Sequence, residues 1–441
     1  MQFQGKLVVA LGAIIIPAFG SLPLQAQDVG HYLAPSDRVI AIRAGHLFDP
    51  RSGNLLDNQV VLVRGERIAE VGPAVQIPAG AMVIDLSTAT ILPGMIDAHV
   101  HVNTGGATLA QRTLRALANA QIDLATGFTT VLDMDSRGTF YTVDLRDAIN
   151  AGNVQGPRMQ VVGQSINPRA TNYYPDTSER SYGGYTENKN VNGPLLARAA
   201  VREAKLHGVD YIKIYTTQDF AGTLHMWRPD ATLVDSPSLS FEEVQAIVDE
   251  AHRLGVKVAC HAYGGEGMHS CINAGVDAPN HLLGLDDDGV KVLLDKKLPY
   301  VPTVDDLIAL EKGDLDATGG RNSRLKMLEQ AVRRAVAANV PIVFGSGVTS
   351  EHIPHGRQAN QFAYYARWGM GPVKALQTAF LPAARLLNYD MENEIGSLEK
   401  GKFADVIAVA GNPTVDVTEM ERVKFVMKGG AVIRNDLVAP R

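Results

Sequence analysis

Residues 92–101 read LPGMIDAHVH, and this segment orients the interpretation of the whole chain. Its Pro-Gly pair predicts a turn, and the apolar run that follows predicts a buried strand over Met95–Val102. Side chains alternate between the two faces of a strand, so His99 and His101 point in the same direction. Imidazole is a common zinc ligand, so two imidazoles on one face can form half of a metal site. A His-x-His pair also occurs by chance, and its meaning depends on the rest of the chain.

The middle of the chain repeats this alternation of buried strand and amphipathic helix. Further strands are predicted at Thr129–Met134, Met159–Ile166, Asp210–Thr216, Lys257–Ala262, Asp277–Leu282, Tyr300–Val304 and Pro341–Phe344. Helices are predicted at Ala107–Ala125, Leu195–His207, Phe241–Leu254 and Arg324–Ala338. Eight β–α units over roughly 290 residues fit an α/β fold of the parallel (β/α)8 barrel type. An open doubly wound sheet is the alternative, but no Gly-rich phosphate-binding fingerprint supports it.

The two ends of the chain carry a different pattern, of short strands separated by turn residues. Strands are predicted at Val39–Ile42, Val60–Val63, Arg67–Val71 and Met82–Ile84 near the start, and at Asp405–Val409, Arg422–Met427 and Ala431–Ile433 near the end. We expect the two ends to pair into one small β-sandwich beside the barrel. The expected division gives residues 27–91 and 391–441 to the sandwich and residues 92–390 to the barrel.

The first 26 residues have the composition of a targeting segment. Lys6 supplies a positive charge, Leu7–Phe19 is an uncharged apolar run, and Gly20–Ala26 is rich in small and polar residues. This order predicts a secretory signal peptide over residues 1–26. A buried strand or a membrane anchor is the alternative, but Pro17 interrupts the run, which is shorter than the ~20 residues of a spanning helix. We expect a secreted or periplasmic protein with no membrane attachment after cleavage.

The overall composition excludes several classes of protein. Of the 441 residues, 46% are hydrophobic and 20% charged, which provides a sizeable core and excludes wholesale disorder. The net charge of −6 argues against a nucleic-acid partner. With only two cysteines, Cys260 and Cys271, a Cys-rich zinc module and a scaffold of several disulfides are excluded. The spacing of the two cysteines leaves their pairing open.

Three more residues on the predicted strands are candidates for chemistry. Lys213 lies in the middle of a strand expected to be buried on both faces, where an amine is costly unless it is paired or chemically changed. A lysine that reaches solvent past a strand end is the structural alternative. His261 and His281 end the fifth and sixth predicted strands, where barrel enzymes carry catalytic groups. Either histidine alone is more often structural, but four histidines and one lysine on these strands are hard to explain by packing.

These residues together resemble the amidohydrolase superfamily, and most closely its imidazolonepropionase-like and Xaa-Pro-dipeptidase-like branch of metal-dependent amide hydrolases. The resemblance covers about residues 39–433 of the chain. It rests on LPGMIDAHVH at 92–101, DYIKI at 210–214, CHAYG at 260–264, NH at 280–281, PHG at 354–356 and GSLEKGKFAD at 396–405. Similar enzymes include some that hydrolyse ochratoxin A.

The resemblance implies two divalent metal ions, usually zinc, and a lysine that CO2 has carboxylated. The implied ligands are His99 and His101 for one ion, His261 and His281 for the other, and N6-carboxylated Lys213 as the bridge. A hydroxide between the ions would attack the amide carbonyl of the substrate, and a metal would polarise that carbonyl. Tyr263, next to a ligand, is implied to contact the substrate or the oxyanion, although an ordinary loop aromatic is an equal alternative.

One position departs from the family pattern. The eighth strand of these enzymes ends in an Asp that binds metal and moves a proton, and Gly347 stands at that position here. Glycine has no side chain for either role, and Glu351 could substitute only if the backbone folds back. Loss of general acid–base catalysis typically costs about 10²–10⁴-fold in rate. The sequence therefore predicts a weakened or inactive form of the enzyme on an otherwise intact site.

The loop after the third predicted strand also departs from the pattern. Dipeptidases of this branch often carry Gly-Gly-His there, whereas residues 167–174 read NPRATNYY and the loop continues to about Tyr185. A pocket reshaped for a bulkier group is one interpretation, and a solvated surface loop is the other. Arg169 and Arg228 are candidates to bind a substrate carboxylate, but the sequence assigns neither.

The expected function is hydrolysis of an amide or peptide bond next to a free carboxylate. Expected substrates are a dipeptide, an N-acyl amino acid or an ochratoxin-like amide, and further copies of the chain are expected as partners in a homo-oligomer. A cyclic-amide hydrolase or a deaminase is the alternative enzyme, and Lys213 argues against a mononuclear deaminase. A metal-binding protein without turnover is the alternative from another class, and Gly347 is the feature that favours it.

Overall fold

The computed structural model describes residues 31–102, 108–137, 139–168, 189–217, 227–234, 236–349 and 354–437. The predicted signal peptide over residues 1–26 lies outside the described residues, as do Arg169, Glu351 and most of the loop after residue 168. Within the described part, no helix combines the length and apolar composition needed to cross a bilayer. The described residues include every predicted site residue except Arg169 and Glu351.

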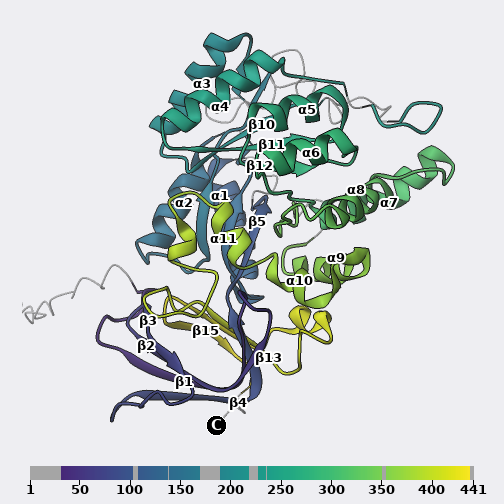
Figure 1. Cartoon of the computed structure of the whole chain (residues 1–441). Coiled ribbons are helices and arrows are strands. Elements are labelled where there is room, and N and C mark those ends of the chain that lie inside the picture. The colour runs from purple at the N-terminus through teal and green to yellow at the C-terminus, as the bar shows by residue number, and fades with distance from the viewer. Residues whose placement is uncertain are drawn as a thin grey trace, which may run out of the picture.

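Both ends of the chain pair in a single seven-stranded sheet. Its strands are β1 (Val39–Phe48), β2 (Leu55–Arg64), β3 (Arg67–Gly72), β4 (Met82–Pro93), β13 (Val406–Val409), β14 (Phe425–Lys428) and β15 (Ala431–Asn435). The order across the sheet is β15-β14-β13-β4-β1-β2-β3, so the junction between the two chain ends is the antiparallel pair β4–β13. Figure 1 shows these purple and yellow strands together, below the helices. The described strands of the two ends thus form one continuous sheet, and residues from both ends share one core cluster.

The middle of the chain forms parallel strands in two further sheets. One contains β5 (Met95–Val100), β6 (Phe128–Asp133) and β7 (Arg158–Val161); the other contains β8 (Ile166–Pro168), β9 (Lys189–Val191), β10 (Tyr211–Tyr215), β11 (Lys257–Ala262) and β12 (Ala278–His281). Single parallel bridges extend this arrangement, from Asn280 to Val301, from Tyr300 to Ile342 and from Val348 to Val100. The last bridge returns to the first strand of the series.

Three strand predictions are wrong in their extent, each for a local reason. Met159–Ile166 is two strands rather than one, because Gly163 adopts a left-handed conformation with φ +64° between them. Tyr300–Val304 is shorter than predicted, because Pro302 has no N–H to pair and Thr303, at φ +59°, turns the chain into the helix that begins at Val304. Arg422 ends a 3₁₀ turn and does not begin β14.

The helices lie between these strands as the apolar periodicity predicts. Their bounds are α1 (Leu109–Ala125), α2 (Tyr141–Asn150), α3 (Pro194–Leu206), α4 (Phe241–Arg253), α5 (Gly265–Ala274), α6 (Asp287–Asp295), α7 (Val304–Thr318), α8 (Arg324–Ala337), α9 (Gln361–Tyr365), α10 (Gly371–Gln377) and α11 (Leu381–Leu386). The four helices predicted from the sequence correspond to α1, α3, α4 and α8. Ser240 begins α4 with a capping box, in which its hydroxyl accepts from the N–H of Glu243.

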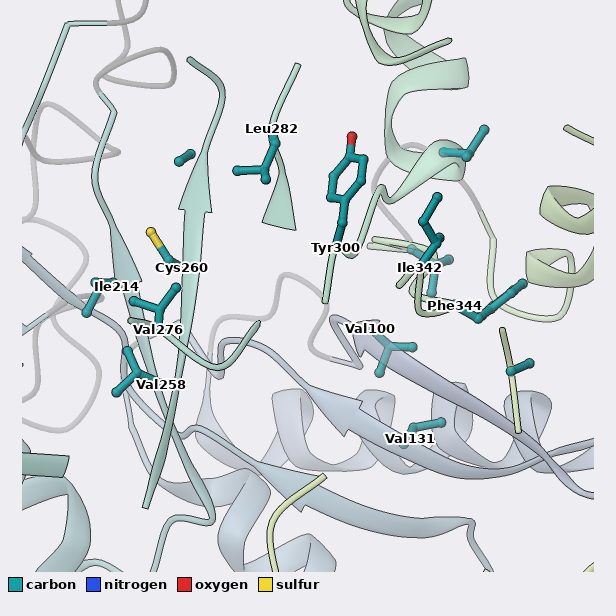
Figure 2. Packing of buried hydrophobic residues seen from close by; sticks show 14 of the residues in the cluster. Val100, Val131, Ile214, Val258, Cys260, Val276, Leu282, Tyr300, Ile342 and Phe344 are labelled. Carbon is teal, nitrogen blue, oxygen red and sulfur yellow. The ribbon is translucent and has the colours of Figure 1, made fainter. Parts of the chain in front are cut away.

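The alternation of buried side chains along the strands decides which residues face the site. In β11, Val258 and Cys260 belong to the large apolar cluster under the helices, part of which Figure 2 shows. Ala259 points the other way, into a smaller cluster inside the ring of strands, and His261 shares that face because it follows two residues later. A disulfide joins Cys260 to Cys271 of α5, with an S–S distance of 2.09 Å.

Candidate active site

The five predicted metal ligands come together at one buried place. His99 lies in β5 and His101 directly after it, Lys213 is in the middle of β10, and His261 and His281 lie at the ends of β11 and β12. Ring centroids are 5.2 Å apart for His99 and His101, 5.3 Å for His99 and His281, and 4.4 Å for His261 and His281. All five side chains are buried, and Lys213 is completely so. The strands bring together residues that are far apart in the sequence.

The two histidines of the first pair face each other through equivalent nitrogens. Nε2 of His99 lies 3.2 Å from Nε2 of His101. Nδ1 of His99 lies 2.8 Å from Oδ1 of Asn280, whose amide nitrogen donates to the carbonyls of Cys260 and Ala278. Because the amide oxygen can only accept, Nδ1 of His99 carries the proton and its Nε2 keeps the lone pair. A metal needs this tautomer in a ligand.

His281 is held in the same tautomer by a different neighbour. Its Nδ1 lies 2.5 Å from Oγ1 of Thr303, and the hydroxyl of Thr303 donates to the carbonyl of Pro302 at 2.6 Å. The single hydroxyl proton is thereby used, so the hydroxyl oxygen accepts from Nδ1 of His281 and leaves Nε2 with its lone pair. His281 itself has φ +70°, a left-handed conformation that non-glycine residues seldom adopt and that gathers at functional sites.

Lys213 has the properties of a chemically used amine rather than of a charge in a salt bridge. Among the described residues its Nζ has no hydrogen-bond partner, and it lies 5.3 Å from the ring centroid of Tyr215. Burial lowers the pKa of Lys213 to about 7, and the carboxylates of Asp135 and Asp306 only partly oppose this effect. The neutral amine is therefore accessible near neutral pH, and it is the form that can react as a nucleophile.

Burial has the same effect on three of the site histidines. Burial lowers the pKa of His99, of His101 and of His281 well below the ordinary value of histidine, and the neighbouring positive charges add to the effect. Neutral imidazole is the form that binds a metal ion. The donor set therefore fits divalent zinc or a similar ion: two fixed lone pairs, neutral rings and an unpaired amine. Among the described residues, however, no three side chains of His, Cys, Asp or Glu already converge on one point as a metal cage.

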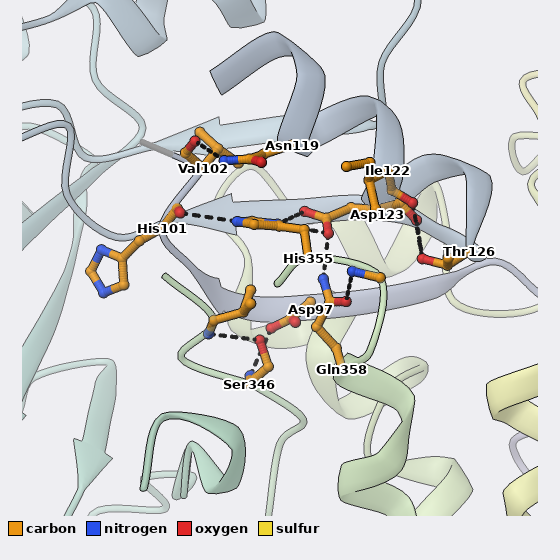
Figure 3. A network of polar contacts seen from close by, with 12 residues as sticks. Asp97, His101, Val102, Asn119, Ile122, Asp123, Thr126, Ser346, His355 and Gln358 are labelled. Carbon is orange, nitrogen blue, oxygen red and sulfur yellow. Dashed lines mark hydrogen bonds and ion pairs between the residues drawn. The ribbon is translucent and has the colours of Figure 1, made fainter. Parts of the chain in front are cut away.

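A second layer of polar residues supports His101 and was not predicted. Nε2 of His355 lies 3.2 Å from the carbonyl oxygen of His101, and its Nδ1 lies 2.8 Å from Oδ1 of Asp123 in α1. Gln358 also donates to Asp123. Figure 3 shows His355 between the two other residues. Burial opposes the charged imidazole, but Asp123 outweighs it and raises the pKa of His355. The motif at 354–356 marked this histidine without giving its role.

Asp97 ties the first strand to the segment that contains Gly347. Its Oδ1 accepts the N–H of His99 at 3.1 Å and the N–H of Ser346 at 3.0 Å, contacts that are visible in part in Figure 3. Burial raises the pKa of Asp97 to about 7. Asp97 follows the Pro-Gly turn in the motif at 92–101. An acidic residue inside an apolar strand is the sequence feature that could have identified it.

The remaining predicted site residues lie in different surroundings. Gly347 directly follows the segment paired with β5, and its N–H donates to the carbonyl of His99 at 2.7 Å. Tyr263 is fully buried, with its ring centroid 4.9 Å from that of His261 and 5.5 Å from that of His281. Arg228 is exposed and donates to the carbonyl of Leu233, while Arg169 lies outside the described residues. Asn280 and Thr303, which fix two tautomers, had no sequence signal other than their places beside predicted strand ends.

Comparison with known proteins identifies the family of this chain. A model of the amidohydrolase family matches residues 90–433, so the chain belongs to that family. Ochratoxinase from Aspergillus niger is 26% identical over 95% of this chain and 92% of its own. A crystal structure of a Xaa-Pro dipeptidase with bound methionine in its active site is 31% identical, with a TM-score of 0.78, covering 90% of this chain and all of that one. A prolidase complexed with N-methylphosphonate-L-proline is 27% identical, with a TM-score of 0.76 and coverage of 90% and 100%.

Membership of this family defines the general chemistry. The family and its ochratoxinase-like and prolidase-like members support hydrolysis of amide or peptide C–N bonds. The structural neighbours are amidohydrolases of mixed α/β content, which agrees with the predicted fold class at that level.

Proposed function

We propose that this chain is an exported, metal-dependent hydrolase that cleaves an amide or peptide bond next to a free carboxylate. The observation that carries the proposal is the amine of Lys213, buried without a hydrogen-bond partner in the same site as four histidines. An unpaired polar group in the interior costs about 1–3 kcal/mol. Such a group is retained where chemistry uses it, and the C–N hydrolysis supported by the family requires a site of this kind.

Two divalent ions, most naturally zinc, are the proposed cofactors. His99 and His101 would hold one ion and His261 and His281 the other, with Lys213 between them as a carbamate. In forming the carbamate, the neutral amine adds to CO2, an N–C bond forms and one proton leaves. When bound, the ions would supply an activated water near neutral pH and polarise the amide carbonyl.

The residues of the chain itself prepare this site. Asn280 and Thr303 hold the tautomers of His99 and His281, and the surrounding apolar residues exclude water from the rings. Tyr263 packs against His261 and His281 and is proposed to contact the substrate or the oxyanion. We further propose that the parallel strands close as a (β/α)8 barrel, for which the Val348–Val100 bridge is the supporting contact. A homo-oligomer without nucleic acid remains the proposed assembly.

The substrate class follows from the relatives. Their names denote hydrolysis of ochratoxin and of Xaa-Pro dipeptides, and in both cases the scissile bond lies next to an amino-acid carboxylate. We therefore propose dipeptides, N-acyl amino acids and ochratoxin-like amides as substrates.

The test is hydrolysis by the zinc-loaded chain of Xaa-Pro dipeptides, N-acetyl amino acids and ochratoxin A, each beside its carboxamide counterpart. We expect the free acids to have kcat/KM values at least about tenfold higher, the effect of one contact worth about 1.4 kcal/mol. Equal rates on acids and carboxamides would contradict the role of the carboxylate. Lys213→Met, which keeps the size of the side chain but not the amine, is the inactive control.

A metal-binding protein without turnover is the second candidate, because Gly347 offers no side chain at the position of the family's eighth-strand Asp. This candidate predicts two bound zinc ions per chain and no hydrolysis of any compound in the panel. Elemental analysis of the same sample shows whether two ions are bound, and turnover of a single compound excludes this candidate.

A further inference from the structure

The resemblance to the family predicts an Asp at position 347, and the conformation of Gly347 accounts for part of the difference. The residue has φ +75°, a left-handed conformation that L side chains seldom adopt. A Cβ at this position would lie 2.9 Å from Cβ of Asp306 and 3.1 Å from Cβ of Thr303. A side chain at 347 is therefore opposed both by the backbone and by the neighbouring turn. Asp306 and Thr303 already occupy the space into which a side chain at 347 would point.

The group that uses this space is the first turn of α7. The N–H of Asp306 donates to the carbonyl of Ser346 at 3.3 Å, which places the turn directly against the eighth-strand segment. Thr303, just before the helix, holds His281 through its hydroxyl. The side chain of Asp306 thus begins within about one van der Waals contact of where an Asp at 347 would begin.

The charge of Asp306 is felt inside the site. It is one of two carboxylates that oppose the effect of burial on the pKa of Lys213. The other is Asp135, which accepts hydrogen bonds from the N–H of Arg137 at 2.8 Å, from Ser165 at 3.1 Å and from Tyr215 at 3.3 Å. Asp135 is buried, whereas Asp306 is partly exposed. The charges of both carboxylates act on the fully buried amine of Lys213.

We infer that Asp306 supplies from α7 the carboxylate that residue 347 lacks, and that Gly347 leaves the room that this carboxylate needs. The inference rests on the proposed metal-dependent hydrolysis and names the acidic group for it. It also replaces the simplest reading of the sequence, in which the absence of Asp at 347 means the absence of an acid from the site.

The direct test is zinc binding by the metal-free chain, measured by competition with a chromophoric chelator. We expect Asp306→Asn to weaken zinc binding at one of the two sites by at least about tenfold, the lower end of what supporting residues of metal sites contribute. Asp305→Asn is the matched control. Asp305 is the preceding residue, and burial raises its pKa well above the ordinary value, so an uncharged amide there imitates its natural state. Unchanged melting temperatures of the metal-free variants will show that neither change disturbs the fold.

A second test moves the carboxylate from position 306 to position 347. If Asp306 has only a structural role, this move does not restore zinc binding. Gly347→Asp alone is expected to lower the melting temperature and not to improve zinc binding, because the new Cβ meets Asp306 and Thr303. The double variant Asp306→Ala with Gly347→Asp removes the closest contact and restores an acid, since Asp tolerates a left-handed backbone better than most residues. We expect it to bind zinc within a few-fold of wild type, whereas Asp306→Ala alone binds weakly.

The outcomes are distinct for the two proposals. If wild type binds two zinc ions and Asp306→Asn binds them equally well, Asp306 is not the missing acid, and the proposed hydrolase function stands without it. If wild type binds no zinc and cleaves none of the amides, the proposed function is wrong and the inference is wrong with it. Better zinc binding by Gly347→Asp with Asp306 intact would show that the site lacks a carboxylate at position 347 and that Asp306 does not replace it.

Discussion

At the scale of single residues, the site is defined by groups whose protonation is set by burial and by one neighbour each. Asn280 and Thr303 leave the lone pairs of His99 and His281 unused by the protein. Lys213 is the extreme case, because no protein group satisfies its amine. These features are costly for folding and are expected where a bound group or a reaction uses them.

Replacement of Lys213 by Met is therefore expected to separate stability from function. The metal-free variant should unfold with a free energy equal to that of wild type or about 1 kcal/mol higher, since an unsatisfied buried amine is replaced by a thioether of similar size. Zinc binding and amide hydrolysis should be lost together. Urea denaturation and chelator competition on the same samples measure both. A loss of several kcal/mol would instead identify Lys213 as a structural residue.

At the scale of secondary-structure elements, strand lysines that look alike in sequence have opposite roles. Lys257 begins β11, and its Nζ donates to the carbonyls of Arg385, Leu386 and Leu387 at 2.8–3.0 Å. These are the terminal carbonyls of α11, where a positive charge also interacts favourably with the helix dipole. Lys257 therefore anchors a helix, whereas Lys213, on the adjacent strand β10, is satisfied by none of the described groups.

Lys257→Met is expected to lower the free energy of unfolding by about 1–3 kcal/mol, because three carbonyls at a helix end lose their donor. Chemical denaturation measures the change. Lys291→Met, on the exposed face of α6, is the matched control and should leave stability within about 0.5 kcal/mol of wild type. Equal effects of the two changes would show that the contacts of Lys257 contribute little.

The C-terminus of α4 provides a pH-dependent contact that is independent of the site. Nε2 of His252 lies 2.8 Å from Oδ2 of Asp277, and this hydrogen bond raises the pKa of His252. A raised pKa in the folded state means that the contribution to stability is complete below the unfolded value of about 6.5 and is lost as pH rises through the folded value.

His252→Gln should therefore destabilise the chain at low pH and have no effect at high pH. The pair is half exposed, so the expected difference is only about 0.5 kcal/mol below about pH 6. Denaturation series for wild type and variant between about pH 5.5 and pH 8.5 measure it. A difference that is constant over this range would mean that the imidazole does not titrate against Asp277.

At the scale of the whole molecule, the two ends of the chain depend on each other. β4 pairs with β13 from Thr90–Val409 to Pro93–Val406, directly before the turn that leads into β5. The core of this sheet takes residues from both ends, among them Ile42 and Phe425. The sheet formed by the chain ends thus fixes the start of the first strand of the site.

Phe425→Ala tests this dependence. Phe425 in β14 is fully buried, so its truncation should cost about 3–5 kcal/mol and lower the melting temperature of the entire chain in one transition. Val415→Ala, at a residue whose side chain is 77% exposed, is the control and should have no measurable effect. Separate melting of two parts in calorimetry would show that the terminal sheet and the parallel strands fold independently.

Local periodicity and motif spacing were sufficient for much of the architecture and of the site. The strands that carry His99, Lys213, His261 and His281 were predicted because each short segment has its own apolar alternation. The hydrophobic periodicity of the sequence did not show where a strand ends when a single residue, such as Thr303, ends it. They also did not give the order in which the strands of the two ends pair in the sheet.

The sequence by itself determined the candidate site residues, the strands that carry them and the absence of an acid at 347, because all of these are local properties. Only the tertiary structure decided their partners. Asn280 beside His99, His355 behind His101 and Asp306 against Gly347 are pairs far apart in the chain, and the packing of parallel strands and helices brings them together. A contact between distant segments depends on how elements pack, and no single segment of sequence contains that information.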